Sequence, residues 1–435
     1  MSSELGKRQN KRISDKAEMY ELLDASFEGG QVYRDKQYLT QYYRESTDQY
    51  ENRLDRSTYI NHLQEILKVL IGLLYNKRPD RLNTPKELDY LKTNIDKINN
   101  IDVFMHRLAC KSMIYTTGLL IDSPDTQVES MKERRDKNIN PYCIVYHPSK
   151  IKDFYFNDSG NLSWVLLDDT VIEKSDPMTE DNVLKYLTLW TENEYFKYIN
   201  IDKELVLVET FTHNLNRCPF LFVNSGDNVI ETTIFEDIVE LSKKIYETLS
   251  YMDESLASGS FNSLFYPVDT LKDMEKVLEL SHDNISELTV IPYPASGGGK
   301  PFFDGVKLDN VEMYIKAVIL YTKQLLHSVG LDYSEEKVAP ESGKAKELDF
   351  KNTESLLIET ATYLENIENE IFIIAGLWEG KQYTNKDIGI IYNKDFISSD
   401  EEQRLTRLYE YFSFTDDEKE KEDIREKIKE YVLKG

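Results

Sequence analysis

The stretch "IFEDIVELSKKIYETLSYM", residues 234–252, carries apolar side chains at spacings of three and four residues. The seam continues one turn further, and its members are Ile234, Ile238, Leu241, Ile245, Leu249, Met252 and Leu256. An α-helix places residues with this spacing on one narrow face, and charged residues fill the remaining positions. The pattern predicts one long helix over residues 231–260 that packs along a single seam.

Two more long helices follow the same rule further along the chain. The first is expected over residues 307–330, where Gly330 stands in the usual position after a helix end. Its seam consists of Val311, Ile315, Val318, Thr322, Leu325 and Val329. The second is expected over about 352–377, and its aligned residues are Leu357, Ala361, Leu364, Ile371, Ile374 and Trp378. Three long seamed helices therefore dominate the C-terminal half.

Residues 261–306 separate the first two of these helices and have a mixed pattern. "LKDMEKVLEL" (271–280) predicts a short helix, and "ELTVIPYP" (287–294) predicts a strand. The glycine-rich "SGGGKPFFDG" (296–305) invites comparison with a nucleotide-binding loop. It lacks the G-x-x-x-x-G-K-[ST] spacing, and Pro301 stands where the magnesium-binding hydroxyl is required. We interpret this stretch as a turn.

The second and third helices are joined by a segment that includes "VAPESGKAKELDF" (338–350). Gly343 and Lys344 are followed by Ala345 rather than Ser or Thr, so this is not a phosphate-binding loop. Ser342 is not in a G-x-S-x-G turn, which argues against a nucleophile, although a histidine distant in sequence leaves that reading open. A mobile charged connector and a plain surface loop both fit the composition.

The N-terminal half combines helices with a β-rich insert. Residues 17–121 have a mostly helical pattern, in which "YENRLDRSTYINHLQEILKVLIGLLYNKRP" (50–79) carries an apolar stripe that ends at Pro79. The stripe consists of Leu54, Ile60, Leu63, Leu67, Leu70 and Leu74. A second helix is expected over about 101–120. From residue 141 to 225, β-branched and aromatic runs predict strands, with a hairpin turn at "NDSG" (157–160). The predicted fold class is mainly α with a β-rich insert (α+β).

The two ends of the chain are polar. Residues 1–16 are basic and lack an apolar core, so we expect a flexible tail rather than a secretory signal. Residues 399–435 predict two short charged helices. The longest apolar run, "ILKVLIGLLY" (66–75), is about half the roughly 20 residues that a membrane span needs. We therefore expect a buried helix at this run and no membrane contact.

Composition limits the classes of function. The chain has 435 residues, which predicts two or more lobes. Its net charge of −25 disfavours a static grip on nucleic acid, because phosphate binding depends on Lys and Arg. The charge does not exclude a protein past which DNA slides. The three cysteines are far apart in sequence, which argues against a disulfide framework or a zinc site.

No residue pattern singles out catalytic chemistry. The six histidines are scattered and form no H-E-x-x-H motif; they are His62, His106, His147, His213, His282 and His327. Acidic pairs such as Asp168 and Asp169 are expected by chance at this carboxylate content, so a carboxylate hydrolase stays open without being favoured. We predict no catalytic residues, no metal and no cofactor. Lys316 and Lys323 share a helix face, which is either a solvated face or a cationic stripe for a polyanion.

Four stretches, taken in order, resemble the portal proteins (head-to-tail connectors) of tailed double-stranded DNA bacteriophages. The first is 50–79, where a helix with Tyr, Arg and Asn precedes an apolar helix ending at K-x-P. The second is "VYHPSKIKDFYFNDSGNLSWVLLDD" (145–169), which is similar to the strands of their wing. The third is "HNLNRCPFLFVN" (213–224), which leads into the long helix, and the fourth is "APESGKAKELDFKNTESLL" (339–357). The resemblance covers about residues 30–400.

The resemblance implies a division of the chain into the parts of a portal subunit. The wing is expected at 17–230 and again in a kinked helix and following segment at 352–398. The stem is expected as two helices at 231–260 and 307–330, the clip at 261–306, the tunnel loop at 331–351 and a short helical crown at 399–435. The DNA-facing residues of the tunnel loop are then Lys337, Pro340, Ser342, Gly343, Lys344 and Lys346, and the lumen-facing stem residues are Lys316 and Lys323.

The resemblance also implies a function. Twelve copies are expected to form a ring at one capsid vertex, assembled in the host cytoplasm and retained in the virion. The ring is expected to be the channel through which double-stranded DNA passes during genome packaging and ejection, without sequence preference. Its expected partners are the terminase large subunit, the head-tail adaptor, and the major capsid and scaffolding proteins. A non-channel structural or scaffold protein is the alternative, followed by a soluble enzyme with an unrecognised carboxylate site.

Overall fold

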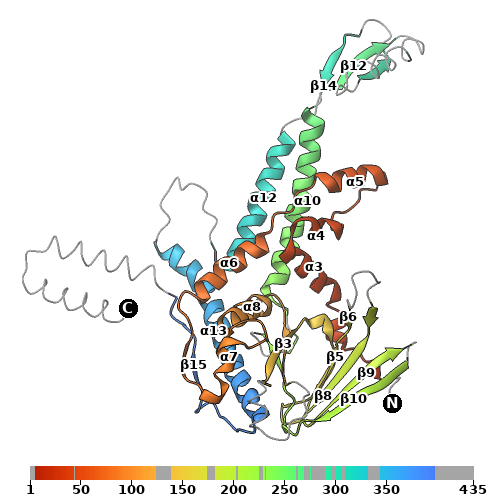
Figure 1. The fold of residues 1–435 in the computed structure, drawn as a ribbon. Coiled ribbons are helices and arrows are strands. Elements are labelled where there is room, and N and C mark those ends of the chain that lie inside the picture. The colour runs from red at the N-terminus through yellow and green to blue at the C-terminus, as the bar shows by residue number, and fades with distance from the viewer. Residues whose placement is uncertain are drawn as a thin grey trace, which may run out of the picture. The chain divides into compact units, whose positions relative to one another are not determined.

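The computed structural model describes thirteen stretches of the chain (Figure 1). They are residues 5–43, 45–123, 139–173, 182–201, 204–224, 229–230, 232–260, 263–268, 275, 290–294, 299–304, 309–331 and 343–396. About 47% of the structure is helix and 24% is strand, a mixed α+β class. The chain divides into two compact units. Unit 1 comprises Met1–Val69, Cys110–Leu119 and Val145–Thr353, and unit 2 comprises Leu70–Ala109, Leu120–Ile144 and Glu354–Gly435.

The described residues 5–16 of the N-terminal segment contact unit 1, within the stretch 1–16 where the sequence predicts a flexible tail. The short helix α2 (Lys11–Ser14) begins after Asn10, whose side chain accepts a hydrogen bond from the Arg12 backbone. The Asn10 backbone N–H donates to the Lys152 carbonyl at 2.6 Å, and Ile13 is 5% exposed. The basic composition did not reveal this attachment, because it depends on one capping residue and one buried isoleucine.

Five longer helices follow in the N-terminal part of the chain. They are α3 (Ala17–Glu28), α4 (Gly30–Asp35), α5 (Thr47–Arg56), α6 (His62–Leu74) and α8 (Ile101–Ile114). The single stripe expected over 50–79 is broken between α5 and α6, where Ser57 adopts an extended backbone. Asn61 then accepts a hydrogen bond from the Gln64 backbone at the start of α6. Ile60 is 39% exposed, so it does not belong to the buried stripe.

The helix expected over 101–120 is also shorter than predicted. It ends at Ile114, and Thr117–Asp122 forms strand β2, in which Leu119, Leu120 and Ile121 are fully buried. A continuous buried apolar run looks the same in a helix and in a central strand, which explains the error. Gly118 fits this strand because a Cβ atom there would lie 2.5 Å from the Phe220 ring. The sheet order is β11-β2-β3, with β3 at Tyr142–Tyr146 and β11 at Phe220–Val223.

The segment expected to be β-rich contains the largest sheet of the structure. Its antiparallel order is β10-β9-β8-β5-β4. The strands are β4 (Ile151–Phe156), β5 (Leu162–Asp168), β8 (Tyr186–Thr191), β9 (Glu194–Ile201) and β10 (Glu204–Thr212). The turn at "NDSG" joins β4 to β5 as predicted, with Gly160 at a φ of 77°. A small antiparallel pair, β6 (Val171–Glu173) and β7 (Asn182–Leu184), completes this part.

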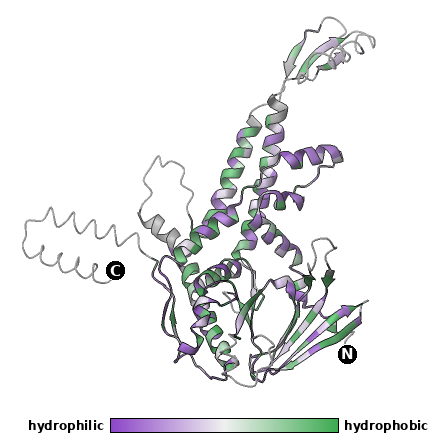
Figure 2. Ribbon diagram, in the orientation of Figure 1, coloured by the Kyte–Doolittle hydropathy of each residue, from purple (hydrophilic) through white to green (hydrophobic). Residues whose placement is uncertain are grey.

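Two long helices of unit 1, α10 (Ile234–Ser260) and α12 (Asp309–Ser328), lie side by side (Figure 1). Both match the predicted seamed helices within a few residues. The rings of Tyr251, near the end of α10, and Tyr314, near the start of α12, are 6.3 Å apart, so the helices run antiparallel. Apolar residues recur along both helices (Figure 2). We call this pair the helical hairpin.

A three-stranded sheet is inserted between the two helices, with order β13-β12-β14. Its strands are β12 (Ser263–Val268), β13 (Val290–Pro294) and β14 (Phe302–Asp304). The sequence predicted β13 but not β12 or β14. Pro267 interrupts the strand pattern of β12, and β14 is too short to carry an alternation. The helix predicted over 271–280 lies outside the described residues, except for Glu275.

Unit 2 is built on α13 (Gly343–Trp378), which continues into it from unit 1. The predicted aligned residues Leu357, Ala361, Leu364, Ile371 and Ile374 are all fully buried. Unit 2 also contains β1 (Asp80–Asn83) paired with β15 (Gly389–Ile391), the 3-10 turn at Lys86–Leu88 and α7 (Tyr90–Thr93). The Trp378 indole N–H donates to the Ile121 carbonyl at 2.9 Å. The α13 seam is therefore the core of this unit.

Helix α13 begins nine residues earlier than predicted, which shortens the connector expected at 331–351. Ala345, Lys346, Glu347 and Leu348 are good helix formers, and no Pro or Gly follows Gly343 before residue 376. Residues 332–342 are outside the described part, as are residues 399–435, where the short helical crown is expected.

Candidate functional site

The helical hairpin has two halves with different surroundings. We define the base half as residues 234–250 of α10 and 321–328 of α12, and the tip half as residues 251–256 and 311–320. In the base half, α10 buries Phe235, Ile238, Val239, Ile245 and Tyr246, each at most 1% exposed. Leu325 of α12 is 0% exposed. The base half is therefore part of the core of unit 1.

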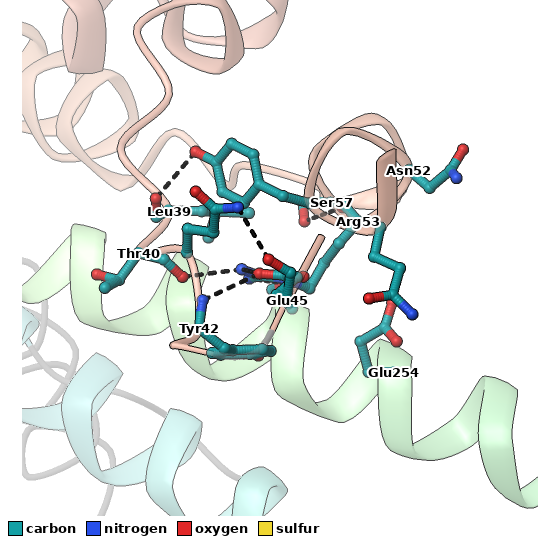
Figure 3. A network of polar contacts seen from close by, with 12 residues as sticks. Leu39, Thr40, Tyr42, Glu45, Asn52, Arg53, Ser57 and Glu254 are labelled. Carbon is teal, nitrogen blue, oxygen red and sulfur yellow. Dashed lines mark hydrogen bonds and ion pairs between the residues drawn. The ribbon is translucent and has the colours of Figure 1, made fainter. Parts of the chain in front are cut away.

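A buried arginine fastens the α5 segment to the base half (Figure 3). The Arg53 side chain is 2% exposed, and its Nε and Nη2 atoms donate to the two carboxylate oxygens of Glu45 at 2.7 and 2.8 Å. Nη2 also donates to the Thr40 carbonyl at 2.8 Å, and Nη1 donates to the Ser250 hydroxyl of α10 at 3.2 Å. We call these four residues the Arg53 cluster. A buried guanidinium needs such partners, because an unpaired buried charge is strongly destabilising.

The electrostatics of the Arg53 cluster follow from these contacts. Hydrogen bonds from Arg53 hold the pKa of Glu45 below its ordinary value, although burial acts in the opposite direction. The guanidinium also lies over the Tyr42 ring, 4.1 Å from its centroid. An exposed pair, Arg56 with Glu254 at 2.6 Å, lies nearby, beside a cavity of about 510 Å³. The sequence alone did not identify this cluster, because Glu45 lies outside the helix that carries Arg53.

The tip half has no buried side chain between residues 251 and 256 or between 311 and 320. Three large apolar side chains of α12 are exposed there: Met313 at 60%, Ile315 at 45% and Leu320 at 53%. Ile315 was predicted to lie in the seam, and its spacing fits that position, but its side chain is not buried there. These exposed apolar side chains are available for contact with another protein.

The predicted lumen-facing lysines lie on the same helix. Lys316 and Lys323 are both exposed, and Lys316 forms an ion pair with Glu312 at 3.6 Å. The helix turns by about 100° per residue. This places the two lysines between Ile315 on one flank and Met313 with Leu320 on the other. The cationic positions are therefore bordered on both sides by exposed apolar side chains.

The other predicted DNA-facing residues fall largely outside the described part. Lys337, Pro340 and Ser342 are not in it, and Gly343, Lys344 and Lys346 are described only as backbone in the first turns of α13. The role of these residues stays a prediction.

A second exposed apolar surface lies on β10, an edge strand of the large sheet. Its exposed members are Val206, Leu207, Val208 and Phe211, each between 40% and 55% exposed. An edge strand also presents backbone N–H and C=O groups on its free side. A long apolar edge strand can pair with a strand of another chain, and its β-branched composition was the only sequence signal for it.

The residues weighed for catalysis or metal binding do not come together. Burial lowers the pKa of His213 to about 4 and raises the pKa of Cys110 to about 11. Both Cys143 and Cys218 are buried as free thiols. Across the described residues, no three His, Cys, Asp or Glu side chains are grouped closely enough to hold a metal ion. Within the same ranges, no helix has the length and apolar character to cross a bilayer.

No family model and no curated protein matches this chain. A functional proposal therefore rests on the chain's own sequence and geometry, above all on the tip half of the hairpin.

Proposed function

We propose that this chain is the subunit of a bacteriophage portal, a ring at one capsid vertex through which double-stranded DNA is packaged and ejected. The observation that carries the proposal is the arrangement of side chains on α12 between residues 313 and 323. Exposed apolar residues lie on both flanks of Lys316 and Lys323. A subunit of a closed ring needs two different contact surfaces, one for each neighbour, and a third surface that faces the channel.

The two apolar flanks suit the neighbour contacts. Ile315 lies on one side of α12, and Met313 and Leu320 lie on the other, each at least 45% exposed. Covering them with a neighbouring subunit would remove apolar area from water at about 25 cal/mol per Å². The lysines between them would then face the channel. A heterologous contact of this kind closes into a ring when its rotation closes.

Charge supports a conduit rather than a clamp on DNA. With a net charge of −25, the chain as a whole repels phosphate. A few lysines on the channel side would contact passing phosphates without holding the duplex in one place, because affinity for DNA rises with the number of phosphates neutralised. The three-stranded sheet β13-β12-β14 between α10 and α12 would be the clip, which is expected to meet the terminase and later the head-tail adaptor.

The alternative, a structural or scaffold protein without a channel, is favoured by one observation, the exposed edge strand β10. Edge-to-edge pairing of strands builds open assemblies as readily as closed ones. The two functions differ in the result of substituting α12, because a channel-less assembly built through β10 does not depend on Met313 or Leu320.

The connector before α13 gives a test of function that leaves the subunit fold in place. Because α13 begins at Gly343, deleting residues 334–341 spares the helix. We expect rings of unchanged mass and a loss of DNA packaging or retention in an assembly assay with the cognate phage components. A matched control replaces the same eight positions with Gly and Ser. Full packaging by the deletion variant would remove the connector from the mechanism.

A further inference from the structure

Unit 2 contains a cavity that the proposed function does not use. Its volume is about 410 Å³, and it lies between the end of α6 and the exposed face of α8. The lining residues are Tyr75, Arg78, Pro79, Asp102, Val103, His106 and Arg107. Four of them lie on α8, at positions 102, 103, 106 and 107. The pairs 102/106 and 103/107 are each about one helical turn apart, so the four residues share a face. The volume falls within the range of roughly 300–1,000 Å³ that is usual for small-molecule sites.

Two of the lining residues are unpaired cations. Within the described part of the chain, neither the Arg78 nor the Arg107 guanidinium forms an ion pair or a hydrogen bond. The chain has 78 acidic residues against 53 basic ones, so carboxylate partners are not scarce. Arg53 and Arg81, which are both bound by carboxylates, are largely buried, whereas Arg78 and Arg107 are exposed. The two guanidinium groups at this cavity are therefore available to an anion from outside the chain.

The single carboxylate of the cavity is already engaged. Asp102 accepts a hydrogen bond from Arg81 Nη1 at 2.7 Å. Arg81 is held on its other side by Glu368, whose side chain is fully buried. Burial opposes the charge of Arg81, but the hydrogen bonds that Arg81 donates to Glu368 outweigh it and raise the arginine pKa. Asp102 is thereby turned toward Arg81 and does not neutralise Arg78 or Arg107.

The rest of the lining is apolar or aromatic. Val103 is 39% exposed, and the rings of Tyr75 and His106 are 5.3 Å apart at an angle of 41°. A bare phosphate ion would contact the arginines and leave this wall uncovered. A ligand that fills the cavity must join an anionic group to a flat apolar body. Guanidinium groups bind phosphate oxygens with two parallel hydrogen bonds, which makes them suited to a phosphate ester.

We infer that this cavity binds a small phosphate ester with a planar ring, of the nucleotide class. The phosphate contacts Arg78 and Arg107, and the ring lies against Val103 and the pair formed by Tyr75 and His106. This site is independent of the portal proposal, because every lining residue belongs to unit 2 and none to the helical hairpin. It would give the subunit a ligand other than the DNA in the channel.

Calorimetric titration of the full-length chain with adenosine monophosphate at fixed ionic strength tests the site. We expect saturable binding with one ligand per chain. Inorganic phosphate and adenosine are each expected to bind at least about tenfold more weakly, because each makes only part of the contacts. Short duplex DNA that competes as well as the monophosphate would overturn the small-molecule assignment, and equal binding of succinate would overturn the phosphate assignment.

Variants distinguish specific binding by the two arginines from a general effect of positive charge. R78A and R107A should each weaken binding by at least about tenfold, since a hydrogen bond to a charged group is lost in each. R107K keeps the charge but loses the planar fork, so it should also bind more weakly. R12A is the matched control, because Arg12 is exposed on α2 in unit 1 and does not line the cavity. Saturable binding that is equally strong in R78A, R107A and R12A, or no binding by a folded wild-type chain, would contradict the site.

Discussion

The two halves of α12 follow one apolar pattern but have opposite surroundings. At the base, Leu325 is fully buried, and α10 beside it contributes Ile238 and Tyr246 at 1% exposure or less. At the tip, Met313 and Leu320 are more than half exposed on a helix that packs against α10. The base half is covered by other residues of its own chain, whereas Met313 and Leu320 in the tip half are exposed and available to another molecule. Stability is therefore expected to depend on the base, and assembly on the tip.

The largest expected effect on stability is at the Arg53 cluster, which holds α5 to the base half. Arg53→Ala leaves the Glu45 carboxylate buried without its partner and should lower the free energy of unfolding by about 3–5 kcal/mol. Urea denaturation followed by tryptophan fluorescence measures the loss. The exposed pair nearby provides the control, because Arg56→Ala should cost less than about 1 kcal/mol. Equal losses in the two variants would show that the Arg53 cluster does not hold α5 to α10.

A pair of leucine substitutions compares the two halves directly. Leu325→Ala removes a fully buried side chain and should cost about 2–5 kcal/mol. Leu320→Ala removes a side chain that is 53% exposed, and its effect on subunit stability should stay within about 0.5 kcal/mol. In mass photometry we expect L320A to have the larger effect on assembly. L320A should reduce the ring population directly, whereas L325A should reduce it only to the extent that the subunit unfolds. A ring population unchanged in L320A and in the stronger M313K variant would remove this flank from the interface.

Acidification is expected to change the stability contributions of the Arg53 cluster and of the tip half in opposite directions. The lowered pKa of Glu45 means that its contribution to stability is present above the ordinary value of 4.5 and is lost as pH falls through the folded pKa. Asp253, in the tip half, has a pKa raised above 3.8, chiefly by burial, so its protonation favours the folded state. Urea midpoints at pH 7 and pH 4 should therefore differ less in E45Q than in the wild type, and more in D253N. Identical pH dependence in all three proteins would contradict both assignments.

The smallest expected effect concerns the lysines between the two flanks. Lys316→Ala breaks an exposed pair with Glu312, so the subunit should change in stability by less than about 0.5 kcal/mol. If Lys316 faces the channel, as proposed, rings of the variant should keep their mass. They should bind DNA more weakly than wild-type rings, and their affinity should depend less steeply on salt concentration. Fluorescence anisotropy of labelled duplex DNA with assembled rings measures it. A loss of rings instead would assign the lysine to a subunit contact.

The long helices could be predicted because their periodicity extends over many turns. The α10, α12 and α13 seams each contain at least five apolar positions, and a tertiary contact cannot easily override such a pattern. Strand β2 was missed because a buried apolar run has no period of its own. The start of α13 was misplaced because a glycine and a lysine-rich turn resemble a loop until their helix propensities are summed.

The candidate sites were less accessible from the sequence. The Arg53 cluster joins residues 40, 45, 53 and 250, and the cavity of unit 2 joins the end of α6 to one face of α8. Such groupings arise from tertiary packing, which a single sequence does not specify. Ile315 shows the same limit, because its spacing fits the seam and its exposure depends on where the neighbouring helices end.

The central claim is that the tip half of the hairpin closes subunits into a ring around a channel. Negative-stain electron microscopy of the purified wild-type chain, with mass photometry of the same sample, tests it most directly. We predict closed rings with a central hole and a mass near twelve times the 50.9 kDa of one chain, and their loss in the M313K variant. A closed ring of another size would keep the channel and correct the number of subunits. Monomers at every concentration, or open assemblies without a hole that persist in M313K, would contradict the claim.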